Sequence, residues 1–234
     1  MDAAPLYLVE GQDYVIQERS ELPFQYLAHL GHGLSASVDK VRDVNTGAVY
    51  ACKTFHVYTS RRHQITWNTI ENELKILWRL REHHHILRVV ATFRSRREVG
   101  IILQPVADQG DLEDFLAVYW ESIHDGDPPH IQDPSTKILC ESFVCLAGVL
   151  EFLHSQRIRH KDIKPGNILI HHGAVLYTDF DFSLDWTPLD CSTTTGMPDA
   201  FTRAAPEVLN HSPRNSKTDI FSLGCVFLEL LSAL

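Results

Sequence analysis

Hydrophobic and polar positions in the first half of the chain follow the spacing of short strands. β-branched, aromatic and small residues gather in the runs 24–30, 36–42 and 49–55, and turn residues separate these runs. Asn45-Thr46-Gly47, between the last two runs, is typical of a hairpin turn because asparagine and glycine tolerate positive φ. The pattern therefore predicts an antiparallel meander.

A helix follows this meander. Over residues 66–81, apolar residues recur at every third or fourth position, which is the period of a helix that buries one face. Strand-like runs return at 89–93 and 99–103. We expect the N-terminal half of the chain to be mainly sheet with one helix.

In the second half of the chain, apolar residues recur mainly at the three- to four-residue spacing of helices rather than at the two-residue spacing of strands. Residues 111–120 and 138–153 predict two helices, and the second carries apolar residues on most faces, which indicates a buried helix. Two short apolar runs, 168–170 and 175–177, are separated by His171-His172-Gly173 and predict a second hairpin.

Composition and charge narrow the class of protein. The 234 residues are 44% hydrophobic and carry a formal net charge of −9, which is typical of a globular protein and argues against nucleic acid as a partner. The longest apolar segment, 220–234, is shorter than the roughly 20 residues that span a bilayer, so we expect no membrane partner. Five scattered cysteines without a CxxC pair are typical of reduced thiols. We therefore expect an intracellular location, cytoplasmic or nuclear.

A glycine-bearing turn is the first motif that points to chemistry. It spans Gly31 to Val38, between two predicted strands, and Lys53 follows on the next strand. Glycines let a backbone approach phosphate closely, and a strand lysine supplies a fixed positive charge. Two alternatives stay open at this point, because a glycine pair in a hairpin can be a plain turn and Lys53 can be a solvated lysine.

A polar loop is the more specific motif. The segment from His160 to Asn167 lies between apolar residues. It offers Asp162 to accept a hydroxyl proton, Lys164 to neutralise a phosphoryl group and Asn167 to bind Mg²⁺. Asp179 ends a later predicted strand and is suited to hold a metal, with a plain turn aspartate as its alternative.

The order of these motifs resembles that of a eukaryotic protein kinase domain of the serine/threonine type. The resemblance runs from Tyr26 to Leu234 and implies an α+β, two-lobe protein-kinase-like fold. It divides the chain into an N-terminal leader (1–24), a small lobe of antiparallel sheet and one helix (25–104), and a mainly helical large lobe (105–234) that is incomplete at its C-terminus. The elements that match in order are the glycine turn, Ala51-x-Lys53, a helix with Glu73, Gln104–Ala107, 160–167, Asp179-Phe180, Ala205-Pro206-Glu207 and Asp219–Gly224.

The resemblance implies that the chain binds ATP and Mg²⁺ and phosphorylates a protein substrate at serine or threonine. Asp162 would be the catalytic aspartate, and Lys164 would contact the transferred phosphate. Asn167 and Asp179 would be the Mg²⁺ ligands. The residues that would bind the nucleotide are Gly31, Gly33, Val38, Ala51, Lys53, Glu73, Leu103, Gln104 and Val106.

Glu73, and not Glu71, is expected to pair with Lys53. The spacing of Glu73 to the apolar residues of helix 66–81 resembles that of the family's helix. Glu71 would point about 200° away around the helix, and we expect it at the surface.

Four departures from the family's pattern leave a second hypothesis open. They are Ala36 in place of the third glycine of the turn, Lys161 in place of the arginine before the catalytic aspartate, Asp181 in place of a glycine free to take positive φ, and an end at Leu234 inside the central helix of the large lobe. The alternative to a kinase is a catalytically weak or inactive pseudokinase that binds nucleotide or protein. A protein partner or self-association would cover the apolar residues left exposed in the large lobe.

The runs of histidine are not expected to bind a metal. His83-His84-His85 and His171-His172 place successive side chains in different directions, and each run lies at a predicted connection between elements. Cys52 is expected to face the core, away from the nucleotide.

Overall fold

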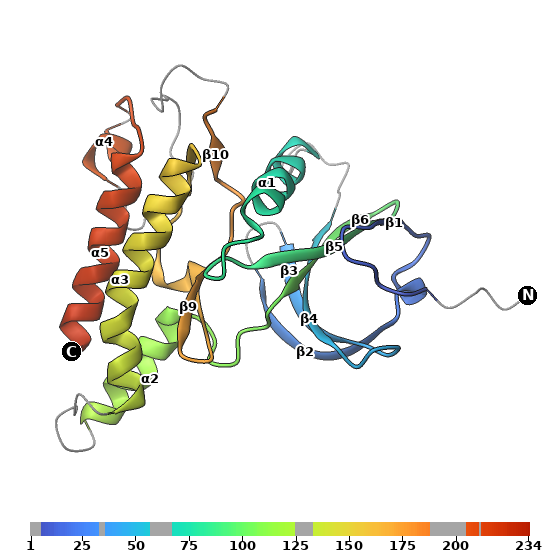
Figure 1. Ribbon diagram of the computed structural model, residues 1–234, viewed down its shortest axis with the longest axis horizontal. Helices are drawn as coiled ribbons and strands as arrows, with labels where there is room; N and C mark the ends of the chain where they lie inside the picture. The colour runs from blue at the N-terminus through green and yellow to red at the C-terminus, as the bar shows by residue number, and fades with distance from the viewer. Residues whose placement is uncertain (1–5, 33–35, 57–66, 125–132, 188–204, 211) are drawn as a thin grey trace, which may run out of the picture. The chain divides into compact units, whose positions relative to one another are not determined.

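The computed structural model describes residues 6–32, 36–56, 67–124, 133–187, 205–210 and 212–234 (Figure 1). The chain divides into two compact units. The first holds Met1–Glu82 and Leu87–Val106, and the second holds His83–Ile86 and Ala107–Leu234. The α+β class expected from the sequence is confirmed, because sheet dominates the first unit and helix dominates the second.

Six strands form one sheet in the described part of the first unit, in the order β1-β5-β6-β4-β3-β2. Neighbouring strands are antiparallel, except that β1 and β5 are parallel. The meander and the later strands expected from the sequence are therefore present. The strands are β1 (Asp13–Val15), β2 (Phe24–His32), β3 (Ala36–Asp43), β4 (Val49–His56), β5 (Arg88–Arg94) and β6 (Glu98–Gln104).

Strand β1 differs from the sequence analysis, which expected a leader over residues 1–24. Asp13–Val15 pairs with the end of β5, and the Thr92 hydroxyl donates to Asp13 Oδ1 at 2.9 Å. Ile16 and Leu22, which follow, are buried in the core of the sheet, with the short helix η1 (Arg19–Glu21) between them. A strand of three residues is too short to show the alternation on which the sequence prediction depended.

Side chains within the turn build the hairpin between β3 and β4. Asp43 Oδ1 accepts the N–H of Asn45 at 2.9 Å, and Asp43 Oδ2 accepts the hydroxyl of Thr46 at 2.9 Å. Gly47 takes φ +75°, which a residue with a Cβ would adopt only at a cost. The turn predicted at this position is confirmed, and it sets the register that continues through both strands.

Apolar residues form the core of the first unit. Cys52 is fully buried there, as expected, and because side chains alternate along a strand, Lys53 points to the opposite face of β4. Helix α1 (Trp67–Leu80) packs against β5 and buries Ile70, Leu77 and other apolar residues. The buried core residues of the sheet are Ile16, Leu22, Val41, Cys52, Val90, Ala91, Phe93 and Ile102.

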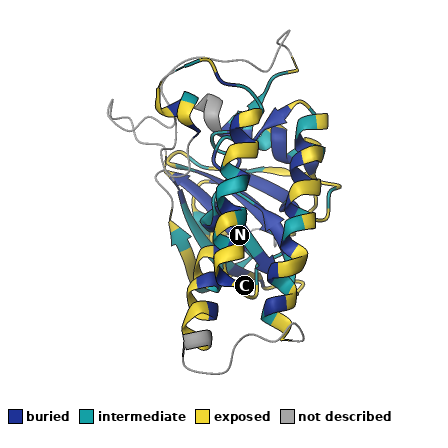
Figure 2. Cartoon of the chain, turned by 90° about the vertical axis from the view of Figure 1, so that its left-hand side faces the viewer, coloured by how far each residue is buried: buried dark blue, intermediate teal, exposed yellow. Residues whose placement is uncertain are grey.

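Helices α3 and α5 lie side by side in the second unit (Figure 1). Buried and exposed positions alternate around these helices (Figure 2), because each buries one face. Helix α5 buries Leu223, Val226 and Leu230 and exposes Leu228 and Leu231. The elements of this unit are α2 (Leu112–His124), α3 (Pro134–Ser155), β7 (Ile158–Arg159), η2 (Pro165–Asn167), β8 (Ile168–His171), β9 (Ala174–Tyr177), β10 (Leu184–Asp185), α4 (Pro206–Leu209) and α5 (Lys217–Ala233).

Helix α3 begins earlier than the sequence predicted because it has an N-cap. Asp133 Oδ1 accepts the N–H of Ser135 at 2.7 Å and that of Thr136 at 3.3 Å, and Pro134 takes the first helical position. By length and composition alone α3 could cross a membrane, but the core helix of a soluble protein passes the same test. Its residues Leu139 and Leu146 are fully buried in the second unit.

Candidate active site

The first unit holds a buried ion pair between β4 and α1. Lys53 Nζ lies 2.9 Å from Glu73 Oε1, and the two residues are 7% and 2% exposed. Glu73 lies one helical turn from the buried residues Ile70 and Leu77, so it shares their face of α1. Glu71 is half-buried and pairs instead with Lys75 at 3.8 Å. The geometry thus places Glu73, and not Glu71, against Lys53.

This pair holds one ammonium group in a fixed position. Lys53 Nζ also lies 5.1 Å from the centre of the Phe55 ring, a distance at which the ring face attracts a cation. Removing one partner of a buried ion pair leaves the other charge desolvated and uncompensated. The pair therefore keeps Lys53 charged and oriented on the sheet.

Strand register brings together several residues expected to bind the nucleotide. Gly31, Val38 and Lys53 stand opposite one another in a row across β2, β3 and β4. Ala51 stands opposite Leu103 on β6. The row gives one side of the sheet a glycine, an apolar side chain and a cation in neighbouring positions.

The remaining residues expected at the nucleotide occupy the end of β6 and the glycine turn. Gln104 ends β6, and its Oε1 accepts a hydrogen bond from Arg88 Nη2 at 3.2 Å. Val106 is the last residue of the first unit and is partly buried. Gly33 lies outside the described residues.

In the second unit, the polar loop ties three functional side chains together. Asp162 Oδ2 accepts hydrogen bonds from Lys164 Nζ and from Asn167 Nδ2, both at 2.8 Å. Asn167 Nδ2 also donates to the main-chain carbonyl of Asp162 at 2.8 Å. Because Asp162 is only 4% exposed, these donors hold its carboxylate in one orientation. The amide oxygen of Asn167 is left as the atom that could bind a metal.

Asp179 is joined to this loop through the main chain. The N–H of Thr178 donates to the carbonyl of Asn167 at 3.1 Å, so the residue before Asp179 is fixed beside the second expected metal ligand. An amide oxygen and a carboxylate are both ligands that Mg²⁺ accepts. The residues present in this unit fit such an ion.

Left-handed backbone occurs at two residues of the site. Lys161 has φ +69° and Asp179 has φ +61°, and such strain in residues other than glycine is concentrated at functional sites. Asp181, which replaces the usual glycine, is not among the described residues with positive φ. The strain expected at Asp181 therefore falls on Asp179 instead.

His160 connects the loop to the strand that precedes Asp179. Its Nε2 lies 3.0 Å from the carbonyl of Thr178, and its Nδ1 lies 3.4 Å from the N–H of Asp162. The carbonyl can only accept and the N–H can only donate, so the ring is neutral and carries its proton on Nε2. Burial lowers the pKa of His160, which agrees with a neutral ring.

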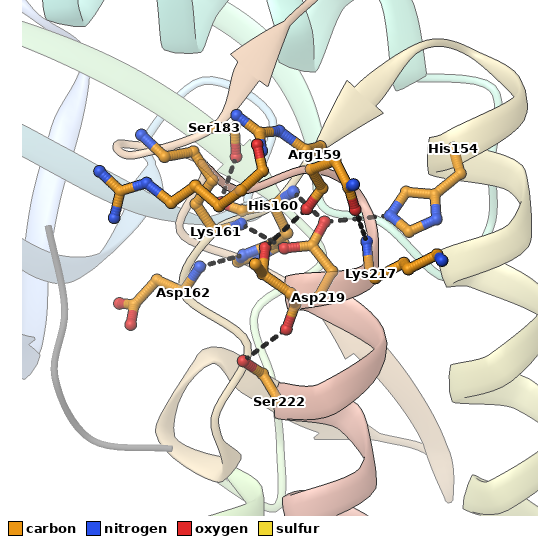
Figure 3. Close-up of polar contacts among 12 residues, drawn as sticks. His154, Arg159, His160, Lys161, Asp162, Ser183, Lys217, Asp219 and Ser222 are labelled. Atoms are coloured by element: carbon orange, nitrogen blue, oxygen red, sulfur yellow. Dashed lines mark hydrogen bonds and ion pairs between the residues drawn. The ribbon is translucent and has the colours of Figure 1, made fainter. Parts of the chain in front are cut away.

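Asp219 on α5 is a functional residue to which sequence reasoning assigned no role. Its carboxylate lies at the centre of Figure 3, directed toward the main chain of His160 and Lys161 and toward the ring of His154. Asp219 accepts the two main-chain N–H groups at 2.9 Å each and His154 Nε2 at 3.0 Å. It thereby fixes the loop one and two residues before Asp162. The signal in the sequence was a carboxylate in the first turn of a mainly apolar helix, because a buried carboxylate requires donors.

Comparisons with known proteins agree with this geometry. Residues 24–233 match the family model of the protein kinase domain. The chain is 30% identical to cAMP-dependent protein kinase type 3 of Saccharomyces cerevisiae, over 89% of this chain and 48% of that protein. It is 31% identical to cyclin-dependent kinase 4 of Xenopus laevis, over 90% of this chain and 64% of that protein. Death-associated protein kinase 2 of Homo sapiens is 30% identical, over 92% of this chain and 56% of that protein. The chain thus spans about half to two thirds of the length of these relatives.

Proposed function

This chain belongs to the protein kinase family, and on that premise we propose that it transfers the terminal phosphoryl group of Mg-ATP to a serine or threonine hydroxyl of a protein. One observation carries the proposal. The Lys164 ammonium and the Asn167 amide both donate hydrogen bonds to the buried Asp162 carboxylate within a single loop. Phosphoryl transfer requires a group that accepts a proton, a group that neutralises charge on the phosphate and a group that binds a metal, and these three side chains supply them.

Each residue has a role that follows from its contacts. Asp162 orients the acceptor hydroxyl and takes its proton, because Lys164 and Asn167 hold its carboxylate in place. Lys164 also neutralises charge on the transferred phosphoryl group. Asn167 and Asp179 hold Mg²⁺, which when bound neutralises the phosphates. Lys53, oriented by Glu73, binds the α- and β-phosphates.

The choice of serine or threonine over tyrosine is supported by Lys164 and by the relatives. A lysine two residues after the catalytic aspartate resembles the serine/threonine branch of the family. One relative that is 29% identical, over 70% of this chain, is serine/threonine-protein kinase nekl-2 of Caenorhabditis elegans. An intracellular location, cytoplasmic or nuclear, belongs to the same proposal and rests on the free thiols of Cys52, Cys140, Cys145 and Cys225.

The decisive experiment measures phosphate transfer from labelled ATP to a serine-containing and a tyrosine-containing protein, with Asp162→Asn as the variant. We expect the wild type to label serine or threonine. We expect Asp162→Asn to lose about 10²–10⁴-fold of the rate, while Mg-ATP still raises its melting temperature, because the nucleotide contacts lie elsewhere. Equal rates of phosphate transfer by the wild type and by Asp162→Asn would overturn the role of Asp162.

The second candidate function is nucleotide binding without transfer. It is supported by Asp181, which adds a carboxylate two residues after Asp179 where the family has a glycine. The same experiment separates the two functions. A wild type whose melting temperature rises with Mg-ATP but which labels no protein is a binding module. Restoring transfer by Asp181→Gly would then identify Asp181 as the cause.

A further inference from the structure

The turn of the β8–β9 hairpin gathers three side chains that can bind a cation. Asp108, His171 and His172 each offer one ligand atom, and these atoms lie within 4.8 Å of one another. The sequence analysis expected no metal here, because successive side chains at a connection between elements point in different directions. The structure differs for a local reason. His172 has φ +49° and Gly173 has φ +76°, so the chain reverses and the two imidazole rings lie with centres 4.0 Å apart.

Main-chain pairing brings Asp108 to the same place. The segment that follows Asp108 runs beside β8, where the N–H of Gln109 donates to the carbonyl of Ile170 at 3.2 Å and the N–H of Ile170 donates to the carbonyl of Gly110 at 2.9 Å. The N–H of His172 donates to Asp108 Oδ1 at 3.0 Å. Two segments far apart in the sequence are therefore joined around the three side chains, and the cluster is built before any ion arrives.

The two imidazoles lie against different oxygens of one carboxylate. Asp108 Oδ2 contacts His172 Nδ1 at 2.9 Å, and Asp108 Oδ1 lies 3.4 Å from His171 Nδ1. An ion bound by these atoms takes the place of a proton on the imidazole. Ligands of zinc bonded at 2.0–2.1 Å stand ~3.3 Å apart in a tetrahedron. His171 Nδ1 is a buried atom with no hydrogen bond in the described part of the chain, so binding an ion there breaks no hydrogen bond. The side chains of Asp108 and His172 are 42% and 78% exposed, which gives an ion a route from solvent.

We propose that Asp108, His171 and His172 bind a divalent transition-metal ion, with Zn²⁺ as the best fit, at the surface of the second unit. Two imidazoles and a carboxylate are typical zinc ligands, and water would complete the tetrahedron. Mg²⁺ and Ca²⁺ prefer oxygen ligands, so the site differs in chemistry from the one formed by Asn167 and Asp179. The bound ion joins the segment at residues 108–111 to the hairpin. The proposal does not depend on phosphoryl transfer.

Two variants remove ligands and leave the local structure in place. Asparagine tolerates positive φ, and Asn-Gly is a preferred pair for a two-residue hairpin turn, so His172→Asn deletes an imidazole without disturbing the turn. Asp108→Asn deletes the charge but keeps an oxygen that can accept the N–H of His172. His84→Asn is the matched control, because His84 is an exposed histidine of the same unit. Melting curves without metal establish that all three variants fold.

The experiment titrates the whole chain with zinc chloride and measures the melting temperature and the binding isotherm. Excess Mg²⁺ is present throughout, so that sites which prefer Mg²⁺ are already filled. We expect Zn²⁺ to raise the melting temperature of the wild type and of His84→Asn, because an ion that binds the folded state stabilises it. We expect affinity to fall about 10-fold or more in His172→Asn and Asp108→Asn. Cobalt absorption is the second measurement, since imidazole and carboxylate ligands lack the intense charge-transfer bands of thiolates.

Three results would overturn the site. The first is a wild type whose melting temperature does not respond to Zn²⁺. The second is equal zinc affinity in the wild type, His172→Asn and Asp108→Asn. The third is a thiolate spectrum with cobalt, which would assign the ion to the cysteines.

Discussion

The contrast between Glu71 and Glu73 shows how position alone separates two residues of one type. Both are carboxylates on α1, two residues apart, yet Glu73 is buried against Lys53 and the Glu71 side chain is 45% exposed beside Lys75. Removing one partner of a buried ion pair costs free energy of folding, because the remaining charge is neither hydrated nor compensated. An exposed pair is worth little, because water and salt screen it.

Substitution of the two glutamates by glutamine tests this contrast. Glu73→Gln removes the charge that lies 2.9 Å from the buried Lys53 ammonium, so we expect the free energy of unfolding to fall by about 3 kcal/mol. Glu71→Gln should change it by less than about 0.5 kcal/mol. Urea denaturation measures both values. Similar losses in the two variants would contradict the burial of the Lys53 pair.

Another residue-scale prediction concerns the neutral ring of His160. Burial lowers the pKa of His160, against the opposing charges of Asp219 and Asp162. As pH falls below about 6.5, the unfolded chain takes up a proton on this histidine and the folded chain does not. The stability that depends on the neutral ring is thus present above that pH and is lost as the pH falls, at up to about 1.4 kcal/mol per pH unit.

Comparison with His160→Gln isolates this loss from that of other groups. We expect the wild type to lose more stability than His160→Gln between about pH 7 and pH 5, measured by urea denaturation at each pH. The exposed residue His84, changed to glutamine, is the control for the loss of a histidine elsewhere in the chain. Parallel profiles for the wild type and His160→Gln would show that His160 titrates normally in the folded chain.

At the scale of elements, the pairing of β5 with β6 places Phe93 opposite Gly100 and leaves no room for a side chain at Gly100. A Cβ built on Gly100 would lie 1.9 Å from Cε1 of the Phe93 ring. Phe93 is itself buried in the core of the sheet, so the ring has little space in which to move. Gly148 on α3 is the opposite case, because a Cβ there meets nothing within 4 Å.

Alanine at these two glycines should have opposite effects. We expect Gly100→Ala to lower the free energy of unfolding by about 1–3 kcal/mol through overpacking. Gly148→Ala should raise it by up to about 1 kcal/mol, because alanine favours a helix more than glycine does. Thermal melts of the two variants beside the wild type measure both effects. A neutral Gly100→Ala would mean that Phe93 moves freely.

Local patterns in the sequence predicted most elements of this fold. The turn at Asn45–Gly47 was found because its side chains make the turn themselves. Strand β1 was missed because three residues show no period, and its position depends on pairing with β5, far along the chain. The pair of Lys53 and Glu73 followed from helical spacing. The proximity of Asp108 to His172 did not, because it depends on a backbone angle and on pairing between distant segments.

At the scale of the whole molecule, the candidate functional residues form two sets, and different elements hold each set in position. One set stands on the sheet of the first unit, where Lys53 and Glu73 join a strand to a helix. The other set stands on a loop of the second unit, where Asp162 is held by its neighbours and by α5.

The anchor at Asp219 has a consequence for how this loop can vary. Asp219 holds main-chain N–H groups of His160 and Lys161, and every residue except proline carries that group. These hydrogen bonds therefore do not involve the side chain at position 161, and only the positive φ of Lys161 restricts which residues fit there. Lysine in place of the family's arginine changes what the loop can present to solvent while its path through space is kept. Lysine or arginine can therefore stand at position 161 while the main chain that leads to Asp162 stays in place.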